Sequence, residues 1–241
     1  MPHGECRALV MALHNNKKQR TMTKQQAIKT EPGVDGAASA EVLASSLAKK
    51  GYKAIGRYYS KSDWKRLTQT EAQQLIAAGL TVFTVYEDAN NSAAQFSSET
   101  GTAQAQEAMR QAQTVIRQPK GTAIYFAVDY DASEQDHDQH IRPYFEAINQ
   151  AFSEAGSPYK VGVYANGLIN QKLLDDKLVD FTWLSQSTGF RNYQEFKDSN
   201  KWNILQGPPV RISGTDFDSD TMNLSQGSFG GFTHLVPQAD T

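Results

Sequence analysis

The 241-residue chain has a single cysteine, Cys6, so it can form neither an internal disulfide nor a zinc site built on several cysteines. It has no apolar run near the ~20 residues that cross a bilayer, and no phosphate-binding glycine loop or nucleophile elbow. Its 24 Lys and Arg are balanced by 26 Asp and Glu, unlike the basic stripe of nucleic-acid-binding proteins. The five histidines show no metal-ligand spacing. We therefore expect no cofactor, metal, membrane span or nucleic-acid partner.

The two ends of the chain lack the alternation of strand-like and helix-like stretches that its middle shows. Residues 8–13 are apolar, but the stretch is shorter than a typical signal-peptide core, and polar residues 15–18 follow it instead of a small-residue cleavage site. We predict no signal peptide, and export by another route stays open. We predict three parts: a flexible leader over 1–30, a folded domain over 31–226 and a flexible tail over 227–241.

Strand-like runs and helix-like stretches alternate along the middle of the chain. The predicted strands are 33–35, 53–59, 80–86, 122–128, 160–164, 181–184, 202–205 and 211–216. The helical stretches between them are 39–50, 70–78, 99–118, 134–155, 168–177 and a short one near 192–196. Such alternation is typical of a parallel α/β fold. We predict a compact (β/α)8 barrel of the TIM type with thin last crossovers, and an open doubly wound sheet is the alternative.

Acidic residues gather where the predicted strands end, which is where α/β barrels place their active sites. They follow four strands, as Asp35, as Glu87 with Asp88, as Asp129 with Asp131, and as Asp216 with Asp218. Two carboxylates in one pocket repel each other, so one of them keeps its proton at neutral pH. A glycosidase uses this division between a protonated acid and an ionised group. The pattern predicts an acidic active site, although any one of these residues could be a surface turn residue.

The pair Asp129 and Asp131 is the most informative of these groups. Side chains two apart in a strand point to the same face, with Cα atoms ~6.5–7 Å apart. Here they follow the buried run 123–128, where packing alone would not select two acids. The alternative for Asp131 is a place in a loop that leads into the next helix. The acidic run 216–220 lacks the glycine and the distal Glu of a calcium-binding loop, so we do not predict calcium there.

Aromatic and amide side chains accompany the acids near the ends of the predicted strands. Aromatic rings stack on the faces of sugars, and amides bond to sugar hydroxyls. The candidates for substrate binding are Tyr58, Tyr86, Tyr164, Asn166, Trp183, Gln186 and Gln206. For each one, ordinary packing in the core or in a loop is the alternative.

Several segments together resemble a known family. They are Gly-Val-Asp at 33–35, Gly-Arg-Tyr-Tyr-Ser at 56–60, the run 124–131, Gly-Val-Tyr-Ala-Asn at 162–166 and Trp-Leu-Ser-Gln at 183–186. In order and spacing they resemble the glycoside-hydrolase-like domain family 1906, from about Gly33 to Ser225. That family is itself similar to the family 25 glycoside hydrolases, the lysozyme-like muramidases.

The resemblance implies roles for individual acids. The muramidases carry an Asp after strand one, Asp-x-Glu after strand four and an Asp after strand eight, and the matching positions here are Asp35, Asp129, Asp131 and Asp216. Asp131 stands where the muramidases have the Glu that acts as general acid, and it is one methylene shorter. Glu87 could supply the missing reach. The resemblance thus implies a barrel in which Asp131 or Glu87 is the acid and Asp129 the second carboxylate, while Asp35 and Asp216 orient substrate.

The expected partner is a polysaccharide. The resemblance implies hydrolysis of a β-1,4-linked amino-sugar glycan such as peptidoglycan. Two alternatives remain: a barrel that binds glycan or cell wall without cleaving it, and a hydrolase of another polysaccharide.

Overall fold

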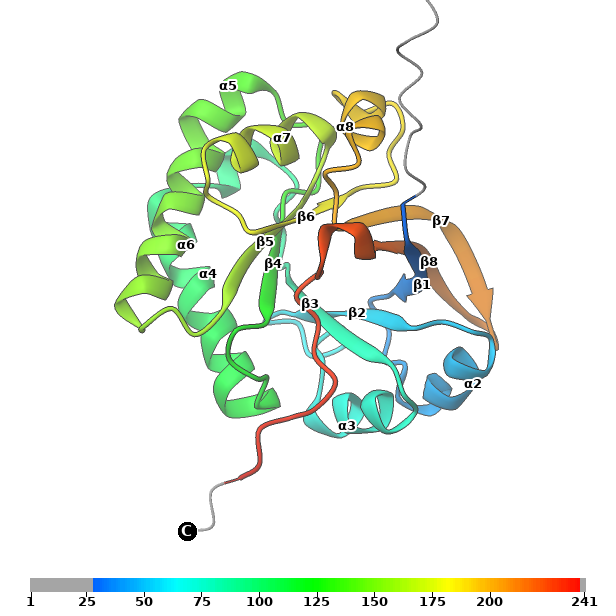
Figure 1. The fold of residues 1–241 in the computed structure, drawn as a ribbon. Coiled ribbons are helices and arrows are strands. Elements are labelled where there is room, and N and C mark those ends of the chain that lie inside the picture. The colour runs from blue at the N-terminus through cyan, green and yellow to red at the C-terminus, as the bar shows by residue number, and fades with distance from the viewer. Residues whose placement is uncertain (1–27, 239–241) are drawn as a thin grey trace, which may run out of the picture.

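The computed structural model describes residues 28–238, and these form the predicted closed eight-stranded barrel (Figure 1). Its strands are β1 (Thr30–Asp35), β2 (Ala54–Tyr59), β3 (Thr81–Tyr86), β4 (Ala123–Ala127), β5 (Lys160–Ala165), β6 (Phe181–Leu184), β7 (Ile204–Ile212) and β8 (Thr215–Asn223). Each strand pairs with its neighbour in sequence, and β8 closes the ring against β1. Most of the predicted leader, residues 1–27, lies outside the described part of the chain.

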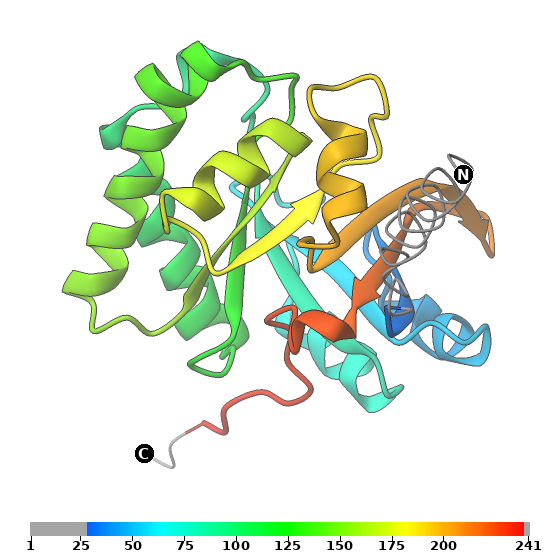
Figure 2. The same ribbon diagram turned by 45° about the horizontal axis from the view of Figure 1, so that its top comes forward.

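Helices connect the first seven strands and cover most of the outside of the barrel (Figures 1 and 2). The α-helices are α2 (Ala44–Lys49), α3 (Gln69–Ala77), α4 (Ser98–Arg110), α5 (Glu134–Asp136), α6 (Arg142–Glu154), α7 (Gly167–Asp175) and α8 (Tyr193–Ser199). The π-helical turns η3 (Gln111–Ile116) and η4 (His137–Ile141) extend α4 and join α5 to α6, while η1 (Glu41–Leu43), η2 (Ala93–Gln95) and η5 (Leu224–Gln226) are short 3₁₀ turns. No helix among residues 28–238 is both long and apolar enough to cross a bilayer.

Two apolar layers result from the two-residue period of the strands. In β4, Ile124 and Phe126 face outward and pack with the helices, whereas Tyr125 faces into the barrel. The inner layer is aromatic: the ring of Phe83 meets Trp183 edge-on at 5.2 Å between centroids, and Tyr125 meets Trp183 at 6.0 Å. This packing fills the barrel interior, so an open cavity can form only above it.

The eighth strand differs from the prediction. Residues 211–216 were expected to form a last parallel strand, but β7 runs on to Ile212 and β8 returns antiparallel from Thr215. Ser213 and Gly214 both have positive φ (51° and 90°), which closes a two-residue hairpin. The last connection is therefore a tight turn with no helix. Because β8 starts at the open end of the barrel and runs back into it, its acids lie along the strand and do not follow it.

The C-terminal segment also differs from the predicted flexible tail. Residues 227–238 lie across one end of the barrel (Figure 1). Phe232 forms an antiparallel bridge with Val82, and the backbone carbonyl of Phe229 accepts from the Tyr125 hydroxyl at 2.9 Å. Both phenylalanines are buried. Because Val82 lies at the start of β3, this segment covers the N-terminal ends of the strands and leaves the opposite end open.

Candidate active site

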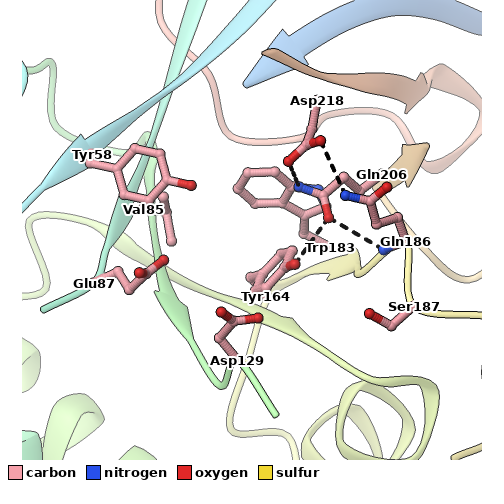
Figure 3. A pocket seen from close by; sticks show the side chains of 10 residues that line it. All are labelled: Tyr58, Val85, Glu87, Asp129, Tyr164, Trp183, Gln186, Ser187, Gln206 and Asp218. Carbon is pink, nitrogen blue, oxygen red and sulfur yellow. Dashed lines mark hydrogen bonds between the residues drawn. The ribbon is translucent and has the colours of Figure 1, made fainter. Parts of the chain in front are cut away.

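A cavity of about 290 Å³ opens at the C-terminal ends of the strands (Figure 3). Its lining combines aromatic, amide and acidic side chains from β2 through β8. The residues are Tyr58, Val85, Glu87, Asp129, Tyr164, Trp183, Gln186, Ser187, Gln206 and Asp218. All of these except Val85 and Ser187 are named from the sequence, either as acids that follow strands or as candidates for substrate binding.

The strands aim these side chains inward through their alternation. Tyr58 is two residues beyond Gly56 on β2, and Glu87 follows Val85 and Phe83 at the end of β3. Gly56 has a specific reason: a Cβ there would come within 2.9 Å of the Asp35 Cβ and 2.6 Å of the Phe83 ring. The missing side chain lets Asp35 approach the centre of the barrel.

Glu87 and Asp129 form the acidic edge of the cavity (Figure 3). Glu87 Oε1 accepts from the Nζ of Lys65 at 3.2 Å. Burial raises the pKa of Glu87, the Lys65 ammonium opposes this effect, and the negative charge of Asp129 adds to it. Burial likewise raises the pKa of Asp129, again opposed by Lys65. Burial and the closeness of these two carboxyl groups favour a state in which one of them keeps its proton, although Lys65 opposes this effect.

A second carboxyl pair lies beneath the cavity. Asp35 and Asp220 are almost fully buried, with 1% and 4% exposure, and they lie close enough for the charge of Asp35 to add to the effect of burial on the pKa of Asp220. Asp35 accepts from Gln206 Nε2 at 2.9 Å and from the Tyr58 hydroxyl at 3.4 Å, while Asp220 accepts from the indole N–H of Trp183 at 3.1 Å. Burial raises the pKa of both groups, that of Asp35 to about 7. Burial and the closeness of the two carboxyl groups therefore favour a state in which the pair holds a proton.

Amides and hydroxyls fix the opposite wall of the cavity. The Tyr164 hydroxyl donates to Gln206 Oε1 at 2.9 Å, and the backbone N–H of Gln186 donates to the same oxygen at 3.3 Å. Gln186 Nε2 donates to Asp218 at 3.1 Å. This network connects β5, β7, β8 and the loop after β6, so it holds the polar wall in one arrangement (Figure 3).

A buried ion pair in the outer layer fixes two loops next to the site. Arg57 and Glu71 are fully buried, and Arg57 Nε donates to Glu71 Oε1 at 2.7 Å. The Arg57 guanidinium also bonds the backbone carbonyls of Gly36, Ala37 and Lys65. These carbonyls belong to the loops after β1 and β2, so one buried cation positions both loops.

Asp131 lies apart from the cavity. Its carboxylate forms an ion pair with the Arg191 guanidinium, accepts from the Arg191 backbone N–H at 2.8 Å and from Asn166 Nδ2 at 3.0 Å. Asn166, expected to bind substrate, instead caps α7 by accepting from the backbone N–H of Ile169. Both residues join the loops after β4, β5 and β6, which is a structural role.

Asp216 and Tyr86 lie away from the cavity as well. Asp216 is at the start of β8, not after it, and pairs with Arg211 across the exposed hairpin at 2.9 Å. It borders a separate hollow of about 190 Å³ beside Asp35. Tyr86 faces the helices because it alternates with Val85, and its hydroxyl donates to Asp88 at 2.7 Å.

Sequence reasoning names neither Lys65 nor Asp220 as a site residue, and it notes Asp218 as a strand-end acid without giving it a role. The two aspartates follow Asp216 at two-residue intervals, so a single antiparallel strand would have placed them on the inner face. Lys65 comes from an irregular loop and carries no periodic signal. Among residues 28–238, no group of three or more His, Cys, Asp or Glu side chains is arranged to hold a metal ion.

Comparison with known proteins agrees with this architecture. Residues 45–217 match the family model described as Rv2525c-like, glycoside hydrolase-like domain. The chain belongs to this family. A relative of this chain, the uncharacterized protein YbfG of Bacillus subtilis (strain 168), is 32% identical over 200 residues, which cover 78% of this chain and 26% of YbfG. The chain thus spans about a quarter of the length of that relative.

Solved structures extend the similarity of the Rv2525c-like domain to hydrolases. The Tat-secreted protein Rv2525c of Mycobacterium tuberculosis superposes with a TM-score of 0.69 at 18% identity, over 85% of this chain and 99% of that one. A family 25 glycosyl hydrolase from Bacillus anthracis superposes with a TM-score of 0.50 at 15% identity, over 85% and 95% of the two chains. At such identities these structures share the fold with this chain.

Proposed function

We propose that this protein hydrolyses a β-1,4-linked amino-sugar glycan such as peptidoglycan, with Glu87 as general acid and Asp129 as second carboxylate. One observation carries the proposal: both groups line one cavity and lie close enough for the charge of Asp129 to raise the pKa of Glu87. A raised pKa lets a carboxylic acid keep a proton near neutral pH. Asp131, the other candidate acid, is held by Arg191 and Asn166.

The reaction follows from these positions. Glu87 gives its proton to the glycosidic oxygen as the bond from that oxygen to the anomeric carbon breaks. Asp129 then stabilises the positive charge at that carbon, either by bonding to it or by taking a proton from the attacking water. Tyr58, Tyr164 and Gln206 line the cavity where the sugar ring binds.

Similar folds support the choice of substrate class and compartment. Structures described as a muramidase from Trichobolus zukalii and a family 25 glycosyl hydrolase share this fold with TM-scores of 0.50. Because Rv2525c is described as Tat-secreted, we include action outside the cytoplasm in the proposal. This location matches a cell-wall substrate.

The first test measures the release of reducing ends from purified peptidoglycan between pH 4 and 8. We expect Glu87→Gln to lower the rate ~10²–10⁴-fold, because the amide cannot give up a proton. The control is Glu146→Gln, which makes the same change on an exposed residue of α6. Equal rates for wild type and Glu87→Gln would contradict the role of Glu87, and no release by wild type would contradict the hydrolase itself.

A second candidate function is glycan binding without cleavage. The ion pair of Glu87 with Lys65 favours it, because the ammonium stabilises the ionised form that cannot act as an acid. Sedimentation of the protein with cell walls, without any release of reducing ends, would identify this function.

A further inference from the structure

The loop between β2 and α3 carries a tryptophan in an unusual position. Trp64 is 69% exposed, whereas the other two tryptophans of the chain, Trp183 and Trp202, are buried at 1% and 3%. Among residues 28–238, the other large hydrophobic side chains with comparable exposure are Val42 and Val236. A ring of this size left in water forfeits the apolar burial that most tryptophans obtain in folded proteins.

The loop itself is well anchored. At its start, the Ser60 hydroxyl and the Lys61 backbone N–H both donate to Asp88, at 2.9 and 2.8 Å. At its end, the Leu67 backbone N–H donates to the carbonyl of Tyr58 at 2.8 Å. The exposed ring therefore projects from a backbone that is fixed on both sides.

The residue next to Trp64 reaches into the cavity. The Lys65 side chain is 8% exposed, and its ammonium lies 3.2 Å from Glu87 and 5.2 Å from the ring centroid of Tyr58. Its backbone carbonyl is fixed by the buried Arg57. Trp64 thus lies on the loop that leaves the C-terminal end of β2, at the same end of the barrel as the cavity and one residue away from a side chain that contacts the proposed acid.

The cavity is small compared with a polymer of sugars. At about 290 Å³ it is at the lower limit of the ~300–1,000 Å³ typical of ligand sites. A polymer of sugars that places one linkage in this space must continue past its edge. An exposed aromatic ring on an anchored loop at this end of the barrel offers a flat apolar surface to the next part of the polymer, at little cost in conformational entropy.

We propose that Trp64 is an outer binding residue, which stacks on a sugar ring of the same glycan chain outside the cavity. This inference rests on the proposed glycan substrate. If Trp64 binds in this way, the protein prefers long glycan strands over short fragments, because only a long strand can fill the cavity and reach Trp64 at the same time.

Acrylamide quenching of tryptophan fluorescence tests this directly, since Trp64 is the one exposed tryptophan of the three. We expect soluble glycan strands, released from peptidoglycan by an amidase, to protect the fluorescence. The disaccharide repeat should protect it little. Trp64→Phe keeps an aromatic ring but loses the exposed fluorophore, so its quenching by acrylamide should be weak and strands should add little protection. The measurement is made on wild type and on Glu87→Gln, in which strands stay intact.

Affinity provides the second readout. We expect Trp64→Ala to weaken strand binding by about three- to tenfold, as estimated from the strength of aromatic contacts. Disaccharide binding should stay unchanged. Val236→Ala, which truncates an exposed apolar side chain of the C-terminal segment, serves as the control.

The outcomes separate this inference from the proposed function. If strands are cleaved but do not protect Trp64 from acrylamide, the outer site is overturned and the hydrolase stands. The same holds if strands are cleaved but wild type and Trp64→Ala bind them with equal affinity. Protection without cleavage would support the outer site and overturn the hydrolase. Failure of strands to bind at all would overturn both.

Discussion

Individual carboxyl groups in this barrel differ in what surrounds them. Asp131 lies near enough in sequence to Asp129 to be taken as its partner, yet it is satisfied by Arg191 and Asn166. Glu87 instead shares the cavity with Asp129 and is in contact with the ammonium of Lys65. The sequence identifies the acids that follow strands, but it cannot show which of them meets a partner on another loop. That depends on loop contacts without any periodic signal.

Replacing Lys65 tests the electrostatics of this site. Lys65 opposes the burial that raises the pKa of Glu87 and of Asp129, so Lys65→Met should raise both pKa values further. The acid then keeps its proton to higher pH, and the second carboxylate needs higher pH to ionise. We expect both limbs of the pH profile of kcat/KM for glycan release to move to higher pH.

The matched control is Lys160→Met, which removes an exposed ammonium from the start of β5. An unchanged profile in Lys65→Met would show that Lys65 does not act on the ionising groups.

At the scale of elements, the first six strands fall within a few residues of their predicted bounds. Each is a short apolar run followed by a helix, and this repeated unit is readable from the sequence. The hairpin of β7 and β8 could not be read from the sequence, because Ser213 and Gly214 form a turn inside what reads as one short strand. That single turn reverses β8, so it places Asp218 in the cavity wall and Asp220 beneath it, and leaves Asp216 outside.

The buried pair of Arg57 and Glu71 joins β2 to α3 and holds two loops, the one that follows Asp35 and the one that bears Lys65. Glu71→Gln leaves the buried guanidinium without its counter-charge. We expect the free energy of unfolding to fall by about 3–5 kcal/mol. Urea denaturation measures this change.

Glu146→Gln, in an exposed pair with Arg142, should lose under ~1 kcal/mol. If Glu71→Gln lowers the free energy of unfolding by no more than Glu146→Gln does, the buried pair does not hold these loops.

At the scale of the whole molecule, one end of the barrel is closed and the other is open. The C-terminal segment covers the N-terminal ends of the strands, where Phe229 packs edge-on against Phe83 at 5.9 Å. The sequence of this segment, with three glycines among its first five residues, reads as a flexible tail, because its contacts are with residues far away along the chain. The core and the carboxyl pair of Asp35 and Asp220 lie between this closure and the cavity.

That buried pair makes the stability of the whole fold depend on pH. Burial raises the pKa of Asp35 from 3.8 to about 7 and that of Asp220 well above its ordinary value, so the folded state binds more protons than the unfolded chain. The stabilisation is complete below pH 4 and is lost as pH rises toward 7. In Asp220→Asn, the amide donates to Asp35 without titrating, so the decline of the unfolding free energy over this range should flatten.

Asp198→Asn, on the exposed face of α8, is the control for urea unfolding at several pH values. If Asp220→Asn shows the same slope as the control, the pair does not titrate as described.

Chemical rescue of Asp129 is the most direct test of the account. Asp129→Ala removes the second carboxylate and leaves space for a small anion beside the anomeric carbon of the bound sugar. We predict that Asp129→Ala releases no reducing ends from peptidoglycan, and that added azide restores bond cleavage and yields a glycosyl azide. Full activity of Asp129→Ala without azide would contradict the placement of the reaction at this cavity.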